Sequence, residues 1–128
     1  MIDHVSIAVS DLARSAAFYE ALLSVLAHKK LVTRERTIGF GKAYPELWIN
    51  LRENSEPRPA DTGFHIALRA RDMATVRAFH ETALELGATC DGPPGPRKAT
   101  NPGYYAAFIR DADGNRIEAV TFVDVETN

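Results

Sequence analysis

The apolar positions of the chain change their spacing after residue 9. Residues 2–9 carry mostly β-branched apolar side chains, which predicts a short strand there. From residue 12 apolar side chains recur at spacings near 3.6, which predicts an amphipathic helix. Its positions are Leu12, Ala16, Tyr19, Leu22, Leu23 and Leu26. Ser10 and Asp11 lie between the two patterns and offer an N-cap, because a short side-chain oxygen can accept from the free N–H groups of the first turn.

The same pattern returns 61 residues later. The identities under this shift include His4/His65, Asp11/Asp72, Phe18/Phe79, Glu20/Glu81 and Leu23/Leu84. The second copy therefore predicts a strand over 64–69, a helix capped by Asp72 and a left-handed helix end at Gly87. Such internal similarity indicates two copies of one supersecondary unit.

Short strand-like segments follow each predicted helix. They span 31–34, 37–41 and 46–52 in the first copy, and 88–90, 104–110 and 115–122 in the second. A tight turn is predicted at Asp111–Asn115, since Gly114 can take a positive φ and the Asx side chains bond locally. Each copy is thus a β-α-β-β-β module. We expect an α+β fold in which two tandem modules form a curved mixed sheet around a central site.

The module boundaries follow from two proline-rich stretches. Module one covers about residues 1–53 and module two about 62–125, joined by a linker at about 54–61 that contains Pro57 and Pro59. A second stretch, Asp91–Gly103, holds four prolines and three glycines and predicts a long stiffened loop, a kind of loop that is often functional.

Composition narrows the class of protein. The 128 residues suit one domain, and 15 Lys and Arg against 17 Asp and Glu leave a formal net charge of −2. Without a basic cluster, an apolar span or a basic N-terminal region, we expect no nucleic-acid or membrane partner and no signal peptide. The single cysteine, Cys90, excludes an internal disulfide and is expected to pack as a small apolar residue. A soluble, cytoplasmic domain is the expectation.

The repeat also indicates a candidate metal site. His4 and His65 occupy equivalent positions, and alternation in the last strand places Glu118 on the same face as two apolar side chains. A carboxylate there is costly unless it is paired or binds a metal. Two imidazoles and one carboxylate can hold a divalent ion and leave positions open for substrate and water. In the alternative, the histidines are structural and the carboxylate pairs with an arginine such as Arg52, Arg69 or Arg110.

Three stretches, His4–Tyr19, Gly63–Leu68 and Phe108–Val120, resemble the vicinal oxygen chelate superfamily, which includes glyoxalase I, bleomycin- and fosfomycin-resistance proteins and extradiol dioxygenases. Pro94–Arg97 with Pro102–Phe108 resembles a group of glyoxalase-like bacterial proteins, most without an assigned substrate. The resemblance covers nearly the whole chain.

The resemblance implies metal ligands on the first and last strands of the modules, here His4, His65 and Glu118. It also implies a homodimer with sites shared across the interface. The ligand set leaves the divalent ion open, because two histidines and one carboxylate accept Zn, Mn, Fe, Ni or Co. The segment Glu46–Leu51, where glyoxalase I carries a glutamate that is both ligand and base, offers no residue clearly aligned with Glu118. A true glyoxalase I is therefore not expected, whereas fosfomycin-resistance enzymes use a set of two histidines and one glutamate.

These observations support two main hypotheses. The first is a metalloenzyme, of lyase, isomerase, transferase or dioxygenase type, that binds adjacent oxygens of a small substrate. Its expected substrate-binding residues are Trp48, Asn50, Arg97, Tyr104 and Tyr105. The second is a metal-free protein of the bleomycin-resistance type that sequesters an aromatic ligand, since large aromatic side chains give binding area at low entropic cost. A structural or regulatory subunit with vestigial ligands is a weaker third possibility.

Overall fold

The chain folds into two modules with the same order of elements. A computed structural model describes residues 1–59, 61–97 and 102–123. The first module consists of β1 (Val5–Val9), α1 (Leu12–Ser24), β2 (Lys29–Thr33), β3 (Thr37–Gly41) and β4 (Leu47–Leu51). The second consists of β5 (Ile66–Arg69), α2 (Met73–Glu85), β6 (Thr89–Pro96), β7 (Tyr104–Arg110) and β8 (Arg116–Phe122). The predicted pair of β-α-β-β-β modules is confirmed.

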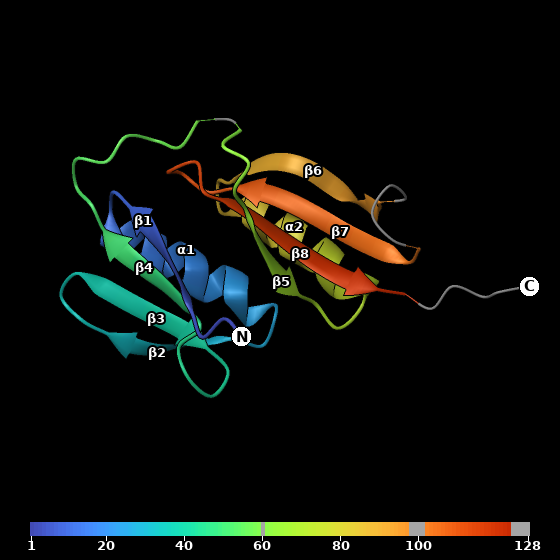
Figure 1. Cartoon of the computed structure of the whole chain (residues 1–128), viewed down its shortest axis with the longest axis horizontal. Helices are drawn as coiled ribbons and strands as arrows, with labels where there is room; N and C mark the ends of the chain where they lie inside the picture. Colours follow the sequence, from blue (N-terminus) through green and yellow to red (C-terminus); the bar gives the residue numbers. More distant parts are fainter. Residues whose placement is uncertain (60, 98–101, 124–128) are drawn as a thin grey trace, which may run out of the picture.

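Each module forms its own four-stranded mixed sheet (Figure 1). The strand orders, β1-β4-β3-β2 and β5-β8-β7-β6, correspond position by position. The first strand of each module runs parallel to the last, and the other neighbours are antiparallel. Helix α1 packs on β2, β3 and β4, α2 packs on β6, β7 and β8, and the two helices contact each other.

Both helices begin at the predicted caps. The Asp11 carboxylate accepts from the backbone N–H of Arg14 at 3.0 Å, and the Asp72 carboxylate accepts from that of Thr75 at 2.8 Å. These bonds satisfy N–H groups that have no partner inside the helix. Gly87 follows α2 with a φ of 95°, as its predicted left-handed role requires. Neither described helix is long and apolar enough to cross a membrane.

One apolar core spans both modules. Side chains of the first module, such as Tyr19 and Phe40, belong to the same buried cluster as Phe79 and Ile109 of the second. Removing this area from water is the main favourable term in folding. The shared core fixes the two sheets relative to each other and so fixes where their open faces point.

The turn Asp111–Asn115 does more than reverse the chain. The Tyr19 hydroxyl donates to the Asp111 carboxylate at 2.6 Å, and Asp113 accepts from both the backbone N–H and the hydroxyl of Ser10, at 3.1 and 2.6 Å. Burial, together with the adjacent Asp111 charge, raises the pKa of Tyr19 well above its ordinary value, so its hydroxyl stays a donor. The predicted turn is confirmed, and it also joins module two to α1.

The expectation of a continuous loop over Asp91–Gly103 is wrong in its first part. Strand β6 runs on to Pro96 and pairs with β7 through two irregularities in register, on either side of Gly92. Proline has no N–H to donate, but β6 is an edge strand, where the missing donor costs no ladder bond. Residues 98–101 of the expected loop lie outside the described part of the chain.

Candidate functional site

The second module places a buried carboxylate among polar partners on its sheet. Glu118 on β8 has only 1% of its surface exposed. One of its oxygens lies 2.8 Å from Nε2 of His65, which precedes β5, and the other accepts from the Tyr104 hydroxyl on β7. A buried carboxylate is tolerated when both oxygens are bonded, as they are here.

Tyr104 is held as a hydrogen-bond donor. Its partial burial, its hydrogen bond to Glu118 and the negative charge of that carboxylate raise the pKa of Tyr104 to about 12, while Arg97 acts in the opposite direction. The phenol therefore keeps its proton at neutral pH and keeps one Glu118 oxygen fixed. Its ring packs edge-on against Phe122 at 5.3 Å between centroids.

Phe108 and Arg97 complete this group, which we call the second half-site: His65, Tyr104, Glu118, Phe108 and Arg97. Phe108 is the cross-strand neighbour of Glu118, and its ring centroid lies 5.8 Å from that of His65. The Arg97 guanidinium lies 5.3 Å from the centroid of the Phe108 ring. Alternation along β7 could have pointed to Phe108 from the sequence, since it shares a face with Tyr104.

The first module carries the other candidate residues. His4, Trp48 and Asn50 line an open cleft of about 680 Å³ together with Asp3, Ser6, Arg34, Thr37, Tyr44 and Pro45. Nδ1 of His4 lies 2.7 Å from the Asp3 carboxylate. Because an ionised carboxylate can only accept, Nδ1 carries the proton, and in the neutral imidazole Nε2 is left with its lone pair. We call the group His4, Asp3, Trp48, Asn50 and Arg34 the first half-site.

The strand register identifies the residue of the first module that is equivalent to Glu118. On β8, Glu118 pairs with Ala67; on β4, Trp48 pairs with Ser6, which is the repeat equivalent of Ala67. Trp48 therefore occupies the position that Glu118 has in the second module. Asn50 lies two residues further along the same face, where its side chain accepts from Thr37.

Within one chain the two half-sites stay apart. Among the described residues, no group of three histidine, cysteine, aspartate or glutamate side chains lies close enough to hold a metal ion. His65 and Glu118 are together, while His4 lines the cleft of the other module. The repeat thus places the two imidazoles at equivalent points of two sheets, not at one point.

Tyr105 takes the opposite face from Tyr104. Its hydroxyl accepts from the Arg77 guanidinium of α2 at 3.3 Å, on the helix side of the sheet. Strand alternation requires this, because adjacent residues point to opposite faces. The structure therefore brings Tyr104 to Glu118 and Tyr105 to the helix.

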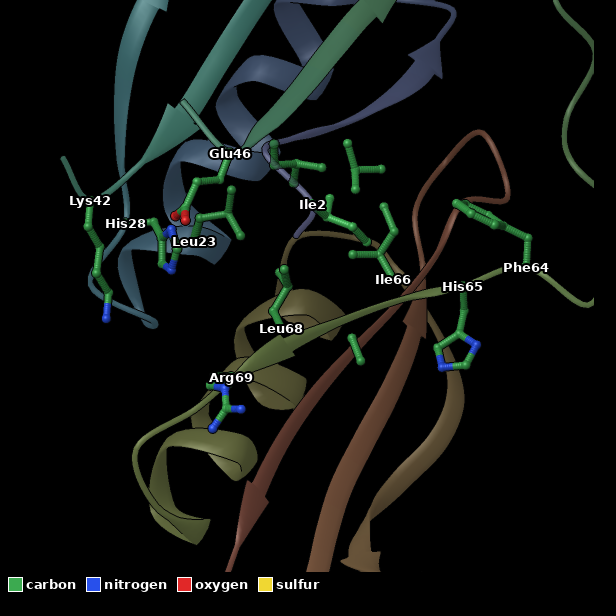
Figure 2. A pocket seen from close by; sticks show the side chains of 13 residues that line it. Ile2, Leu23, His28, Lys42, Glu46, Phe64, His65, Ile66, Leu68 and Arg69 are labelled. Carbon is green, nitrogen blue, oxygen red and sulfur yellow. The ribbon is translucent and has the colours of Figure 1, made fainter. Parts of the chain in front are cut away.

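An apolar groove of about 580 Å³ lies between the modules, beside β5, and His65 of the second half-site is one of its lining residues (Figure 2). His28, Lys42 and Glu46 gather at one end, and Ile2 lies between them and His65. Burial and the positive charge of Lys42 lower the pKa of His28, against the opposing effect of Glu46. Glu46 is the carboxylate closest in sequence to Trp48, in the segment where glyoxalase I carries its additional glutamate ligand. It lines this groove and is not among the residues that line the cleft of Trp48.

Cys90 differs from its expected role. It is exposed on the edge strand β6, and its sulfur lies 3.1 Å from Nε2 of His80 on α2. The expectation of a small core residue is wrong, because β6 is an edge strand. Burial lowers the pKa of His80, which keeps that imidazole neutral near neutral pH.

Comparisons with known proteins agree with this fold. The model of the family described as "Glyoxalase/Bleomycin resistance protein/Dioxygenase superfamily" matches residues 1–119. Among curated proteins no match is found.

Several solved structures are similar over nearly the whole chain. A glyoxalase/bleomycin resistance protein from Albidiferax ferrireducens T118 is 31% identical, with a TM-score of 0.81 over 92% of this chain and 96% of that one. The fosfomycin resistance protein FosX from Mesorhizobium loti is 23% identical, with a TM-score of 0.70 over 96% and 92%. A mutant of FosX from Listeria monocytogenes, in complex with Mn(II) and 1S,2S-dihydroxypropylphosphonic acid, is 19% identical, with a TM-score of 0.69 over 93% and 87%.

Proposed function

Because the chain belongs to the Glyoxalase/Bleomycin resistance protein/Dioxygenase superfamily, we propose that it is a metal-dependent enzyme acting on a small molecule with adjacent oxygens. The proposed ligands of the divalent ion are His4, His65 and Glu118. The observation that carries the proposal is the buried carboxylate of Glu118 facing an imidazole nitrogen at 2.8 Å. The FosX structure with Mn(II) and a dihydroxy phosphonic acid supports a metal and a substrate of this kind.

The residues of the second half-site fit a divalent ion. Imidazole nitrogen and carboxylate oxygen are ligands that Zn, Mn, Fe, Co and Ni all accept. His65 and Glu118 would hold a divalent ion through the imidazole nitrogen and the carboxylate, and the proton that they now share would be released, as is common when a metal binds. Tyr104 holds the second carboxylate oxygen, as the outer hydrogen-bond partners of metal ligands do.

On the first module, a neighbouring carboxylate orients His4 as a possible metal ligand. Asp3 accepts from Nδ1 and so fixes the tautomer in which Nε2 is free to bind a metal. A carboxylate paired with a histidine in this way is a frequent arrangement around metal-binding imidazoles. This contact supports His4 as a ligand more strongly than its position in the repeat alone.

We propose that the site is completed by a second copy of the chain. Three ligands are not brought together within the described residues of one chain, and β1 and β5 each end a sheet beside the groove of Figure 2. An exposed sheet edge is a natural place for another chain to pair. In a twofold dimer, the first half-site of one copy would face the second half-site of the other, twice. We place this homodimer in the cytoplasm, in accord with a chain whose only cysteine forms no disulfide.

The chemistry follows from the ligands and their surroundings. A divalent ion, when bound, acts as a Lewis acid toward substrate oxygens. Tyr104 keeps the Glu118 carboxylate oriented and, with its pKa of about 12, does not itself take up or release a proton near neutral pH. Trp48 and Phe108 give the two half-sites apolar walls that would orient the substrate and exclude water.

The register argues against the reaction of glyoxalase I. That reaction uses a glutamate in the first module as ligand and base, and Trp48 stands at the position equivalent to Glu118. An indole cannot bind the ion or move a proton in this role. We therefore propose a three-ligand enzyme without a glutamate base on β4.

Metal content tests the proposal directly. Purified protein should retain about one equivalent of Zn²⁺ or Mn²⁺ per chain after dialysis, and His4→Ala, His65→Ala and Glu118→Gln should each weaken metal affinity by more than about 100-fold, beyond the range seen for outer partners. His28→Ala is the matched control, since His28 lies in the groove outside both half-sites. If His28→Ala lowers affinity as much as His65→Ala, the ion is bound elsewhere.

A complementation experiment tests whether two chains share the site. Neither His4→Ala nor Glu118→Gln protein should hold metal alone, yet their heterodimer would contain one intact set of ligands. Random association on co-expression gives about half heterodimers, each with one of two sites restored, so about a quarter of the wild-type metal should return. A site within one chain would recover no metal, and that result would refute the shared site.

A metal-free binding protein is the second candidate. The half-buried Trp48, with Arg34 stacked on its ring at 5.3 Å in an open cleft, is the observation that favours it. A sequestered aromatic ligand should quench the fluorescence of Trp48 equally with and without a chelator. Quenching that disappears with the chelator supports the enzyme instead.

A further inference from the structure

Each module stacks one arginine on an aromatic ring at its half-site. The guanidinium of Arg34 lies 5.3 Å from the centroid of the Trp48 ring, and that of Arg97 lies 5.3 Å from the centroid of the Phe108 ring. Arg34 follows β2 and Arg97 follows β6, which are the corresponding edge strands of the two sheets. Both modules therefore carry such a stack, although the two rings stand on strands that are not equivalent, Trp48 on β4 and Phe108 on β7.

The backbone holds both arginines in the same manner. The N–H of Arg34 donates to the carbonyl of Thr37 at 2.9 Å, and the N–H of Arg97 donates to that of Tyr104 at 2.8 Å. In each case the acceptor is the first residue of the next strand. Each arginine is thus fixed where the chain turns back into the sheet.

A glycine makes room for each ring. A Cβ added to Gly39 on β3 would lie 2.9 Å from the Trp48 ring, and one added to Gly92 on β6 would lie 3.0 Å from the Phe108 ring. The Gly92 Cβ would also come within 3.3 Å of the Arg97 guanidinium. Both stacks therefore depend on the absence of a side chain on the adjacent strand, so they are built into the sheet.

Both stacks adjoin the proposed metal ligands. Trp48 holds the position equivalent to Glu118 and lines the same cleft as His4, while Phe108 is the cross-strand neighbour of Glu118 and contacts His65. Arg97 is close enough for its charge to act on the Tyr104 hydroxyl. In the proposed dimer, Arg34 of one copy and Arg97 of the other would flank the shared site.

The charge of these arginines is not balanced by a described carboxylate. Arg14, Arg36, Arg110 and Arg116 form ion pairs in the described part of the chain, whereas no such pair is found there for Arg34 or Arg97. The guanidinium of Arg97 donates to the carbonyls of Pro93, Gly95 and Pro96, at 2.7 to 3.3 Å, which orient it without neutralising it. A divalent ion held by Glu118 would add to this positive potential, which the Asp3 carboxylate of the first half-site offsets only in part.

We propose that the substrate is an anion, an inference that rests on the proposed function. It carries a carboxylate or similar oxyanion near the two oxygens that the metal holds, and Arg34 and Arg97 bind this charged group. A guanidinium presents planar paired donors that match carboxylates and related oxyanions. Stacking on an aromatic face limits the rotamers that binding must fix. Arg97 already gives three of its five N–H donors to backbone carbonyls, which leaves two for the substrate. A neutral substrate would provide no negative charge for the two guanidinium groups.

The test compares two ligands that share the same metal-binding oxygens. Protocatechuate and its neutral carboxamide carry the same pair of catechol oxygens. They differ only in the other ring substituent, which is a carboxylate in the first and an uncharged amide in the second. On Mn²⁺- or Zn²⁺-loaded protein, titration calorimetry should show the carboxylate binding about tenfold tighter, the gain of one charge-assisted contact. Arg34→Gln and Arg97→Gln should each reduce this preference while the metal stoichiometry stays unchanged, which also shows that the variants are folded.

Two exposed arginines serve as controls. Arg36→Gln is two residues from Arg34, and Arg71→Gln lies just before α2; both pair with carboxylates at 3.6 Å and should keep the full preference. If the controls lower it equally, the effect is one of overall charge and the inference is overturned. It is also overturned if wild-type protein binds both ligands equally, an outcome that leaves the proposed function intact. Failure of the protein to hold metal or either ligand would refute the proposed function itself.

Discussion

The open faces of the two sheets share one architecture and carry different chemistry. Strand order and register agree, yet the first module presents Trp48 where the second presents Glu118. In the second module Tyr104 and His65 satisfy the carboxylate, whereas in the first the indole ring lies over Gly39. The repeat therefore determines where a side chain can act, and the residue at that position determines whether it binds a metal or forms a wall.

The turns before the last strands differ as well. In the first module, residues 42–46 are mostly exposed. In the second, Asp111, Asp113 and Asn115 are buried and bonded to module one. Duplicated modules can thus divide their roles, since among the contacts of the described residues only the second of the two equivalent turns hydrogen-bonds to the other module.

The largest expected loss of stability is at the Asp111–Asn115 turn, which joins the two modules. Gly114→Ala should lower the free energy of unfolding by about 2–4 kcal/mol, because alanine resists its φ of 81° and its Cβ would lie 2.7 Å from the Arg58 carbonyl oxygen. Denaturant unfolding measures the loss.

Gly63→Ala is the matched control for strain alone. Gly63 has a φ of 78°, and a Cβ there would meet nothing within 4 Å, so the expected loss is only about 1–2 kcal/mol. Equal losses in the two variants would mean that the packing of the turn on Arg58 contributes nothing.

The next prediction makes the first half-site resemble the second. Trp48→Glu places a carboxylate at the position equivalent to Glu118 and should tighten metal binding by about 10–100-fold, the value of one contact to a charged group. Metal titration against a competing chelator measures this change. Unchanged affinity would indicate that the face of β4 does not meet the ion, and would contradict the shared site.

Tyr104→Phe removes the hydroxyl that fixes Glu118, and the first module has no counterpart to this bond among its described contacts. Metal affinity should fall about tenfold, at the lower end of the range for outer hydrogen-bond partners. Tyr105→Phe is the control, since that hydroxyl accepts from Arg77 on the opposite face. A similar loss in both variants would point to damage of β7 instead.

The smallest expected effect separates the two edge strands. Asp91 on β6 accepts from Arg110 and Arg116 and is largely buried, while β2 offers only the exposed pair of Lys30 with Glu20. Burial alone would raise the pKa of Asp91, but the two arginines outweigh it and lower the pKa below its usual value. At pH 7, Asp91→Asn should cost about 1 kcal/mol, and Glu20→Gln less than about 0.5 kcal/mol.

The pH dependence of this difference follows from the lowered pKa. The stabilisation by Asp91 is complete above the unfolded pKa of about 3.9 and is lost as the pH falls through the lower folded value. Unfolding curves of wild type and Asp91→Asn should therefore be separated at pH 7 and converge below about pH 4. A constant separation down to pH 2 would show that the carboxylate charge is not the cause.

The fold was largely readable from the sequence, because its signals are local and occur twice. Asp11 and Asp72 cap both helices, and Gly87 and Gly114 take the positive φ that their positions predict. The sequence predicts β6 too short, since prolines suggest a loop unless the strand is known to lie at an edge.

The candidate site was readable only in part. His65 and Glu118 meet because β5 and β8 are neighbours, which the repeat suggests. Alternation alone would have separated Tyr104 from Tyr105. The stack of Arg34 on Trp48 and the contacts of Asp113 with Ser10 depend on packing between distant segments, for which no local pattern exists.

The bonds of the Asp111–Asn115 turn also bear on the order in which the chain can fold. Asp113 binds Ser10 at a separation of 103 residues, and Asn115 donates to the Ala8 carbonyl at the end of β1. During synthesis, the beginning of module one must therefore wait until residues 113–115 have been made before its final contacts can form. Contacts so far apart in sequence slow folding, and we expect them to make the two modules unfold together as one cooperative unit.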